Sequence, residues 1–565
     1  MKKTISLMLM MIMVFGLAAC GGGGSSQPAG QSSGASTSSS TGAPPPGQPT
    51  MNVTMPGPDS NPIPAGTEVI IPASDEPQYG GVVKMVTNAD LSAAFGLPWK
   101  TAISNATQPI VPFGECLVLE STGGDIFPWL ATDWEIDDVK KEVRLNLRED
   151  VWFSDGSKFN ADVVVWNYTM ARAEGPGYLN PAIDHVEARG EYAVAVVMAN
   201  DTFANNILNI LSSHVYAIAS KENFDKFGME YAGEHPVGTG PFILTEKVPG
   251  VGVKYVRNDD YWQKGKPYLD GFEFVVIPDA QTQINAMMAP PGPSRVDVLN
   301  NPGVEQLAIL AQDPELTIYA YPSGVTCLYP SSRNPESPFA DLKVRQAVSF
   351  ALDREALAAA RGFGFQHPAT QFVPKGYYGH FNDERNYFEY NPDKARQLLT
   401  EAGYPNGIDT KYYASTTSDW DMATAITKML EDVGIRCDME FLEGGAFTAL
   451  RSTNGWDEGL VYTGFGSLAS MPTSYRLALD PQYAYNKGTQ RPEGYDEAYA
   501  ALYLTLHFDQ KLAEVTHGLL ADNMTMIPML WSVSANVTRN SIIDAEYGYW
   551  AVGTQWLPSE MWLKQ

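Results

Sequence analysis

A proline-rich crossing followed by two capped helices is the feature that most constrains this fold, and it lies between Thr326 and Gly364. The stretch begins as a strand and then meets three prolines, which cannot continue a regular element: Pro330, Pro335 and Pro338. Asp341 and Asp353 stand where side chains cap helices, and Gly362 is placed to end the second helix. Apolar residues recur at helical spacing behind the first cap: Val344, Val348, Ala351 and Leu352. The stretch therefore predicts a linker that enters a new globular unit.

The N-terminus has the layout of a secretory signal. Lys2 and Lys3 precede a largely apolar run from Ile5 to Ala19, which is short for a membrane span. The run ends in Leu-Ala-Ala-Cys-Gly, which resembles a bacterial lipobox, and Cys20 would then carry a diacylglycerol anchor. A plain signal peptide with a coincidental cysteine is the alternative. We expect residues 1–20 to be a lipoprotein signal.

Residues 21–78 have the composition of a tether. They are rich in Gly, Ser, Pro and Gln, and no charged residue occurs before Asp59. Such a segment cannot bury a core, and it is typical of a flexible linker. The folded part is expected to start near Tyr79, outside the cell.

Charge and cysteine content narrow the function classes. The 565 residues carry 38 Lys and Arg against 65 Asp and Glu, a formal charge of −27, which disfavours binding to nucleic acid phosphates. Beyond Cys20, three cysteines remain and allow at most one disulfide: Cys116, Cys327 and Cys437. Free buried thiols are the favoured interpretation.

The sequence contains no HExxH, CxxC, GxSxG or GxxxxGK[ST] motif, and its seven histidines are not clustered. A pair of catalytic carboxylates remains possible among so many acids. We therefore predict a binding protein that is not an enzyme and that uses neither a metal nor a cofactor.

Strands and helices of moderate length alternate along the rest of the chain. Val143, Leu145 and Leu147 alternate with polar residues as in a half-buried strand, while Asn160 and Asn391 precede helical patterns. A further helix is predicted from Met422 to Val433, and the segment from Met526 to the end is rich in strand patterns. This alternation predicts an α/β protein.

Several motifs together carry a family resemblance. They are Val344-Arg345-Gln346-Ala347 with Asp353-Arg354, Ser154-Asp155-Gly156 before Ala161-Asp162-Val163, Pro236-Val237-Gly238-Thr239-Gly240-Pro241, and Asn391-Pro392-Asp393-Lys394-Ala395. In the residues and the order of these motifs, the chain resembles the extracellular solute-binding proteins of peptide-type ABC importers, family 5. The resemblance extends over about residues 79–565.

The resemblance implies a fold and a set of partners. The fold is α/β and two-lobed, periplasmic-binding-protein-like of type II, with an extra subdomain inserted in lobe 1. Closure is expected at hinge crossings near Gly240 and Leu328. Implied partners are a solute, two ABC permease subunits and their ATPases, for a monomer anchored by lipid on the extracytoplasmic face of the cell membrane. The expected domains are lobe 1 at 79–115, 238–327 and 526–565, the inserted subdomain at 116–237, and lobe 2 at 328–525.

The sequence departs from its peptide-binding relatives at one stretch. In those relatives a W..D..DP pattern supplies an aspartate that binds the peptide ammonium. In this chain the corresponding region before Pro472 contains Phe465, Ser467 and Met471. Because a buried cation needs such a partner, we expect an uncharged solute, with an oligosaccharide or another neutral organic molecule favoured over a peptide.

Six residues at predicted strand ends and loops are the candidate ligand-binding residues: Trp99, Tyr329, Trp420, Tyr462, Phe465 and Ser467. Aromatic rings and small hydroxyls suit a flat or hydroxyl-bearing ligand, although ordinary packing is the alternative for each of them. A peptide-binding member of the family, a tethered hydrolase and a surface adhesin or sensor remain alternative functions.

Overall fold

The computed structural model describes residues 76–87, 95–100, 105–121, 125–137, 139–174, 183–199, 207–373, 380, 388–465, 475, 478–479, 486–503, 509–543, 545 and 556–564. The predictions for the signal and for most of the tether lie outside these residues. All of the described residues belong to one compact unit. Within the described part, no helix combines the length and the apolar character that a membrane crossing requires.

A ten-stranded mixed sheet runs through this unit, with the strand order β14-β13-β15-β12-β16-β11-β1-β10-β9-β8. The strands at one side, called here the first half of the sheet, are β1 (Val82–Thr87), β8 (Phe242–Val248), β9 (Gly252–Arg257), β10 (Gly271–Val276) and β11 (Val298–Asn300). The second half consists of β13 (Ile408–Ser415), β14 (Ile435–Leu442) and β15 (Leu460–Phe465). In both halves the chain makes parallel pairs, β1 with β10 and β11, and β13 with β14 and β15.

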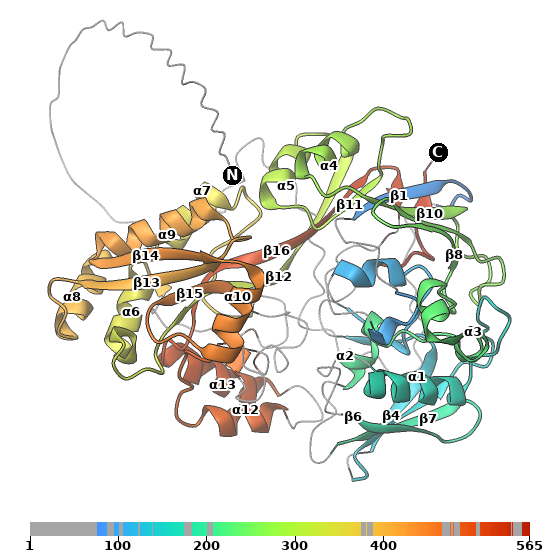
Figure 1. Cartoon of the computed structure of the whole chain (residues 1–565), viewed down its shortest axis with the longest axis horizontal. Helices are drawn as coiled ribbons and strands as arrows, with labels where there is room; N and C mark the ends of the chain where they lie inside the picture. Colours follow the sequence, from blue (N-terminus) through green and yellow to red (C-terminus); the bar gives the residue numbers. More distant parts are fainter. Residues whose placement is uncertain are drawn as a thin grey trace, which may run out of the picture. The chain divides into compact units, whose positions relative to one another are not determined.

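Two long antiparallel strands join the halves of the sheet. They are β12 (Leu316–Pro330) and β16 (Ile527–Arg539), which lie side by side in Figure 1. β16 also pairs with β11 of the first half, while β12 pairs with β15 of the second. The prediction that the chain after Met526 is strand-rich is confirmed by β16, β17 (Ile542–Ile543) and β18 (Trp562–Leu563).

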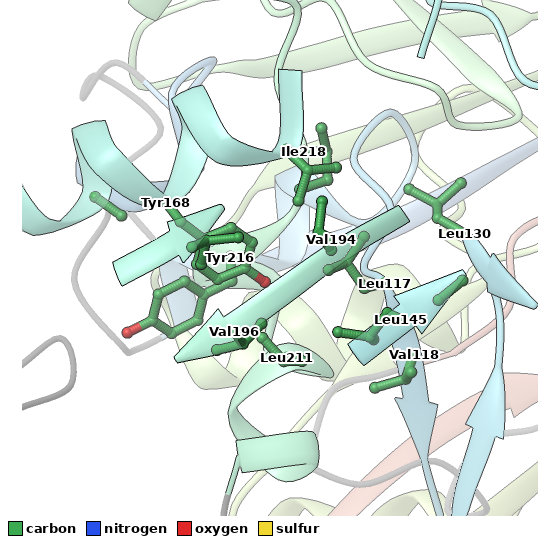
Figure 2. Close-up of a cluster of buried hydrophobic side chains, with 14 of the residues drawn as sticks. Leu117, Val118, Leu130, Leu145, Tyr168, Val194, Val196, Leu211, Tyr216 and Ile218 are labelled. Atoms are coloured by element: carbon green, nitrogen blue, oxygen red, sulfur yellow. The ribbon is translucent and has the colours of Figure 1, made fainter. Parts of the chain in front are cut away.

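A separate four-stranded antiparallel sheet has the order β4-β5-β7-β6, from β4 (Ala131–Asp137), β5 (Glu142–Leu147), β6 (Ile183–Ala188) and β7 (Ala193–Met198). Its buried side chains pack with α1 (Ala161–Glu174), α2 (Ile207–Leu211) and α3 (Lys221–Glu234). Figure 2 shows part of this core, where the rings of Tyr168 and Tyr216 stack near Val196. Leu97 and Trp99 belong to the same core, so it extends beyond the range 116–237 given for the inserted subdomain, whose limits stay a prediction.

Helices of the second half begin where the sequence predicts. Asp341 caps α6 (Leu342–Phe350) by accepting a hydrogen bond from the Lys343 N–H, and Asp353 caps α7 (Arg354–Arg361) in the same way. Asn391 caps α8 (Pro392–Glu401). Together with α9 (Trp420–Asp432) these helices pack on one face of β13 and β15. The predicted caps are confirmed, because each depends on residues only a few positions apart.

The other helices cover the remaining faces. α4 (Ala280–Met287) and α5 (Val304–Leu310) pack on one face of the first half of the sheet. α10 (Gly444–Ala449), α12 (Tyr495–Tyr503) and α13 (Gln510–Asp522) surround an aromatic cluster on the second face of β12 and β15.

The two arginines of the family motifs are buried, and both bind backbone carbonyls. Arg345 donates to the carbonyl oxygens of Phe339, Ala340 and Asn523. Arg354 donates to Pro528 O on β16 and to the carbonyls of Ser349, Leu352 and Phe388. Arg354 therefore connects α7 to the crossing strand β16, and Arg345 connects α6 to Asn523 at the end of α13, which gives the motif VRQA…DR a structural reason.

Candidate functional site

The crossing of β12 and β16 is the part of the fold where the two halves of the sheet meet. The pairing of the two strands is shifted between Pro322 and Gly324 and again between Val325 and Cys327. Such bulges bend a strand and locally increase its twist. Along β12, residues up to Ala320 pack in the core of the first half, and residues from Val325 pack in the core of the second half. The irregular pairing lies between these two parts of the strand.

The structure places one of the two expected crossings differently. Leu328 lies in β12, as predicted, but the second crossing strand is β16 rather than the chain near Gly240. Gly240 precedes the edge strand β8, and its N–H donates to Phe113 O at 2.8 Å. A Cβ at this position would stand 2.6 Å from the carbonyl carbon of Phe113. The Gly-Thr-Gly-Pro motif therefore permits a close backbone contact within the first half.

A second link between the halves lies beside the crossing. Arg361 at the end of α7 forms ion pairs with Asp419 at 2.8 Å and with Glu305 of α5 at 3.0 Å. Phe365, just after α7, is 2% exposed and packs in the core beneath α4 and α5. Helix α7 therefore contacts elements of both halves.

The predicted residues on β12 and β15 divide between the two faces of the sheet. Tyr329 and Phe465 lie in the aromatic cluster with Phe372 and Tyr475, whereas Tyr462 lies on the opposite face, stacked on Tyr412. The reason is the alternation of side chains along a strand, since Tyr462 and Phe465 are three positions apart. Tyr329 and Phe465 are thus brought together, and Tyr462 is separated from them.

The other three candidates lie elsewhere. Trp99 is 1% exposed in the core of the four-stranded sheet, edge-to-face with Trp166. Trp420 is 57% exposed at the start of α9, where its ring stacks on Phe441 at 4.5 Å. Ser467 lies outside the described residues. Ligand contact by any of the six stays a prediction.

Sequence reasoning missed a buried carboxylate in the first half, that of Glu115. Its Oε1 accepts hydrogen bonds from the Tyr261 hydroxyl at 2.6 Å and from Trp129 Nε1 at 2.9 Å. Its Oε2 accepts from the Thr239 hydroxyl at 2.7 Å and from Trp262 Nε1 at 2.9 Å. Burial raises the pKa of the Glu115 carboxyl, and the four donors oppose that rise. The available signal was an isolated acid in the apolar run from Pro109 to Leu119.

A small cavity of about 20 Å³ lies beside Glu115, and Cys116, His214, Trp556 and Ser559 contribute to its wall. This volume holds about one water molecule, so it is too small for an organic solute. Among the residues that the structure describes, no group of three or more His, Cys, Asp or Glu side chains could hold a metal ion. Glu115 instead links segments that are distant in the sequence.

Comparison with known proteins identifies the class. The solved structure of HbpA2 from Haemophilus parasuis matches 86% of this chain and 100% of its own, with a TM-score of 0.73 and 22% identity. NikA from Brucella suis, in complex with Fe(III)-EDTA, matches with a TM-score of 0.73 and 19% identity over 86% of this chain and 100% of its own. The fold is therefore that of the two-lobed α/β binding proteins, as predicted.

The family follows from the sequence comparison. The family model "Bacterial extracellular solute-binding proteins, family 5 Middle" matches residues 125–485. This chain belongs to that family, which confirms the resemblance of its motifs. Heme-binding protein A of Haemophilus influenzae is 28% identical over 347 residues, 55% of this chain and 61% of that protein. Glutathione-binding protein GsiB of Escherichia coli is 31% identical over 349 residues, 60% of this chain and 66% of that protein. The alignments span less than two thirds of these curated relatives.

Proposed function

We propose that this protein is the extracytoplasmic substrate-binding component of an ABC importer, which captures a solute between its lobes and delivers it to two permease subunits and their ATPases. The family match over residues 125–485 is the observation that carries the proposal. The two crossing strands support hinge closure, because ligand that contacts both lobes favours the closed form by its differential affinity. In this role the protein binds and releases solute as a monomer, without chemical turnover.

For the solute, we propose an oligosaccharide or another neutral organic molecule. Similar proteins bind heme and glutathione, and one protein of the same fold was solved with the peptide STSA, so proteins of this fold bind several classes of ligand. Phe465, at the end of β15, packs 5.7 Å from Phe372 and 5.4 Å from Tyr475 between ring centroids, an apolar setting just before the region where peptide-binding relatives carry an acid. A peptide remains the alternative ligand.

Titration of intrinsic tryptophan fluorescence distinguishes these ligands. We expect saturable changes with a panel of neutral oligosaccharides and smaller or no changes with di- to pentapeptides. Any peptide that binds should bind equally well after acetylation of its N-terminus, because no carboxylate is expected for the ammonium. Tight peptide binding that acetylation abolishes would contradict the neutral-solute proposal and would leave the importer role intact.

We further propose that Cys20 is the lipidated first residue of the mature protein on the extracytoplasmic face of the cell membrane. The charged pair and apolar run before Leu-Ala-Ala-Cys support this. Replacing Cys20 with alanine should release the protein from the membrane fraction or block its processing, as detected by immunoblotting of fractionated cells. A processed Cys20→Ala protein that stays in the membrane fraction would rule out lipidation at this cysteine.

A further inference from the structure

A row of polar residues lies on one face of the first half of the sheet. Asn300 of β11 is directly opposite Asn536 of β16, and Val298 is opposite Thr538. Directly paired residues point to the same face of a sheet, as do residues two positions apart on one strand. Asn300, Asn536 and Thr538 therefore share one face.

These side chains are buried, and several of their polar atoms lack partners. Asn536 and Thr538 are each 1% exposed. Across the described residues, neither amide atom of Asn536 has a hydrogen-bond partner, and the same holds for the Thr538 hydroxyl and for Oδ1 of Asn300. Buried polar groups without partners are rare because each one destabilises the folded state. Four such atoms on one face leave hydrogen-bonding capacity that the described residues do not satisfy.

Their position in the sheet is where α/β proteins bind ligands. β1 lies between two parallel neighbours, because the chain after β1 reaches β10 on one side of it and then crosses to β11 on the other side. Ligands of open α/β sheets bind beyond the carboxyl ends of strands at such switch points. Asn300 is the last residue of β11, and Asn536 lies on the crossing strand β16.

The neighbouring strand positions on this face carry uncharged side chains. Residues that lie side by side on neighbouring strands form a row across the sheet. The row through Val298 also contains Met85, Phe274 and Thr317, and the row through Asn300 contains Tyr319, all of them neutral. Arg539 follows Thr538 on the opposite face, where it donates to the carbonyl of Ala289. A carboxamide in a neutral environment pairs with a group that both donates and accepts hydrogen bonds.

We propose that Asn300, Asn536 and Thr538 form a ligand-binding subsite for a neutral group that both donates and accepts hydrogen bonds, either an amide or a hydroxyl. The subsite rests on the proposed function and gives its ligand a chemical requirement. Because Asn536 lies on β16, a ligand held there contacts a strand that continues into the second lobe. Both sources of this chemistry, peptide units and sugar hydroxyls, are available to a solute-binding protein.

The decisive variant is Asn536→Leu in the full-length protein, tested with N-acetylated, C-amidated trialanine and with maltotriose as probes. Leucine removes the two unpaired amide atoms at similar volume. The melting temperature of the free variant should therefore equal or exceed that of the wild type, because a polar residue that serves binding does not stabilise the free protein. Affinity for the probe that binds the wild type should fall about tenfold or more, because the ligand group loses its partners.

Two threonines provide the matched control. Thr538→Val removes a hydroxyl without a partner, and Thr317→Val removes its neighbour on β12, whose hydroxyl already donates to Asn540 at 2.7 Å. We expect Thr538→Val to weaken binding and Thr317→Val to leave it unchanged. Tighter binding of trialanine identifies an amide as the ligand group, whereas tighter binding of maltotriose identifies a hydroxyl.

The outcomes separate this subsite from the importer role. Undiminished probe binding by Asn536→Leu overturns the subsite and leaves the proposed function standing. A clearly lower melting temperature of the free variant also overturns it, since that result identifies an internal water network that stabilises the wild type. A wild-type protein that binds neither these probes nor the wider panel overturns the subsite and the proposed solute class together.

Discussion

Replacing Arg354 with methionine should lower the free energy of unfolding by about 3 kcal/mol. Arg354 is 3% exposed as a residue, and its guanidinium has no carboxylate partner among the described residues. It donates to Ser349 Oγ at 3.2 Å and to four backbone carbonyls, including Pro528 O at 2.8 Å. Methionine keeps much of the volume but leaves these oxygens without a donor, and hydrogen bonds from a charged donor are among the stronger ones.

Removing the charge also relieves a cost of burial, so the sign of the change depends on magnitudes. Burial lowers the pKa of Arg354 to about 9, so the side chain remains charged at neutral pH. Five hydrogen bonds to a cation, at roughly 1.5–3 kcal/mol each, exceed a desolvation penalty of several kcal/mol. The variant should therefore be less stable than the wild type.

Urea unfolding at neutral pH, followed by circular dichroism and tryptophan fluorescence, measures the effect. Arg396→Met on α8 is the matched control, because Arg396 is half exposed and pairs with the exposed Asp393. That variant should stay within about 0.5 kcal/mol of the wild type. An Arg354→Met protein that unfolds at the same urea concentration as the control would show that the carbonyls find other donors.

The sequence predicted best those features that depend on neighbours in the chain. Asp341, Asp353 and Asn391 cap helices because a side chain three or so positions before a free N–H can reach it in any fold. The resemblance of the motifs to the family also predicted the crossing at Leu328 and the two-lobed architecture. The reason for the motif arginines was not visible, since the carbonyls that Arg354 binds include that of Pro528, 174 positions away.

The grouping of the candidate site residues could not be predicted from the sequence alone, because it depends on which face of a strand a residue occupies. Tyr329 and Phe465 meet in one cluster, but Tyr462 points to the other side of β15. The register that decides this comes from pairing between β12 and β15, which lie far apart in the sequence. Glu115 and Asn536 were missed for the same reason: their significance is their burial and their partners, or lack of them, after folding.

The second large effect is expected for Glu115→Gln, although the two side chains have nearly the same shape. Each carboxylate oxygen accepts two hydrogen bonds, one of them from an indole N–H that cannot act as an acceptor. Whichever oxygen becomes an NH₂ group, it faces the N–H of Trp129 or of Trp262. One half-buried indole N–H thus loses its acceptor, and we expect the free energy of unfolding to fall by about 2–3 kcal/mol.

The pH dependence gives this prediction a second readout. Because burial raises the pKa of Glu115 above the ordinary 4.5, the folded protein keeps this proton where the unfolded chain has lost it. The stability that this proton contributes is fully present below pH 4.5 and is lost as the pH rises through the folded pKa. A protonated carboxyl can still accept from both indoles while donating to Thr239. The difference between wild type and Glu115→Gln should therefore be largest in acid and shrink as the pH rises.

The exposed Glu246, which pairs with the equally exposed Lys254 at 2.8 Å, supplies the matched control for the same isosteric change. Glu246→Gln should lie close to the wild type at every pH, because an exposed ion pair contributes at most about 1 kcal/mol. Denaturant midpoints of all three proteins, measured from pH 4 to pH 8, test both parts. If Glu115→Gln were as stable as Glu246→Gln throughout, the hydrogen bonds to Glu115 would not hold Trp129 and Trp262 in place, and packing alone would fix this junction.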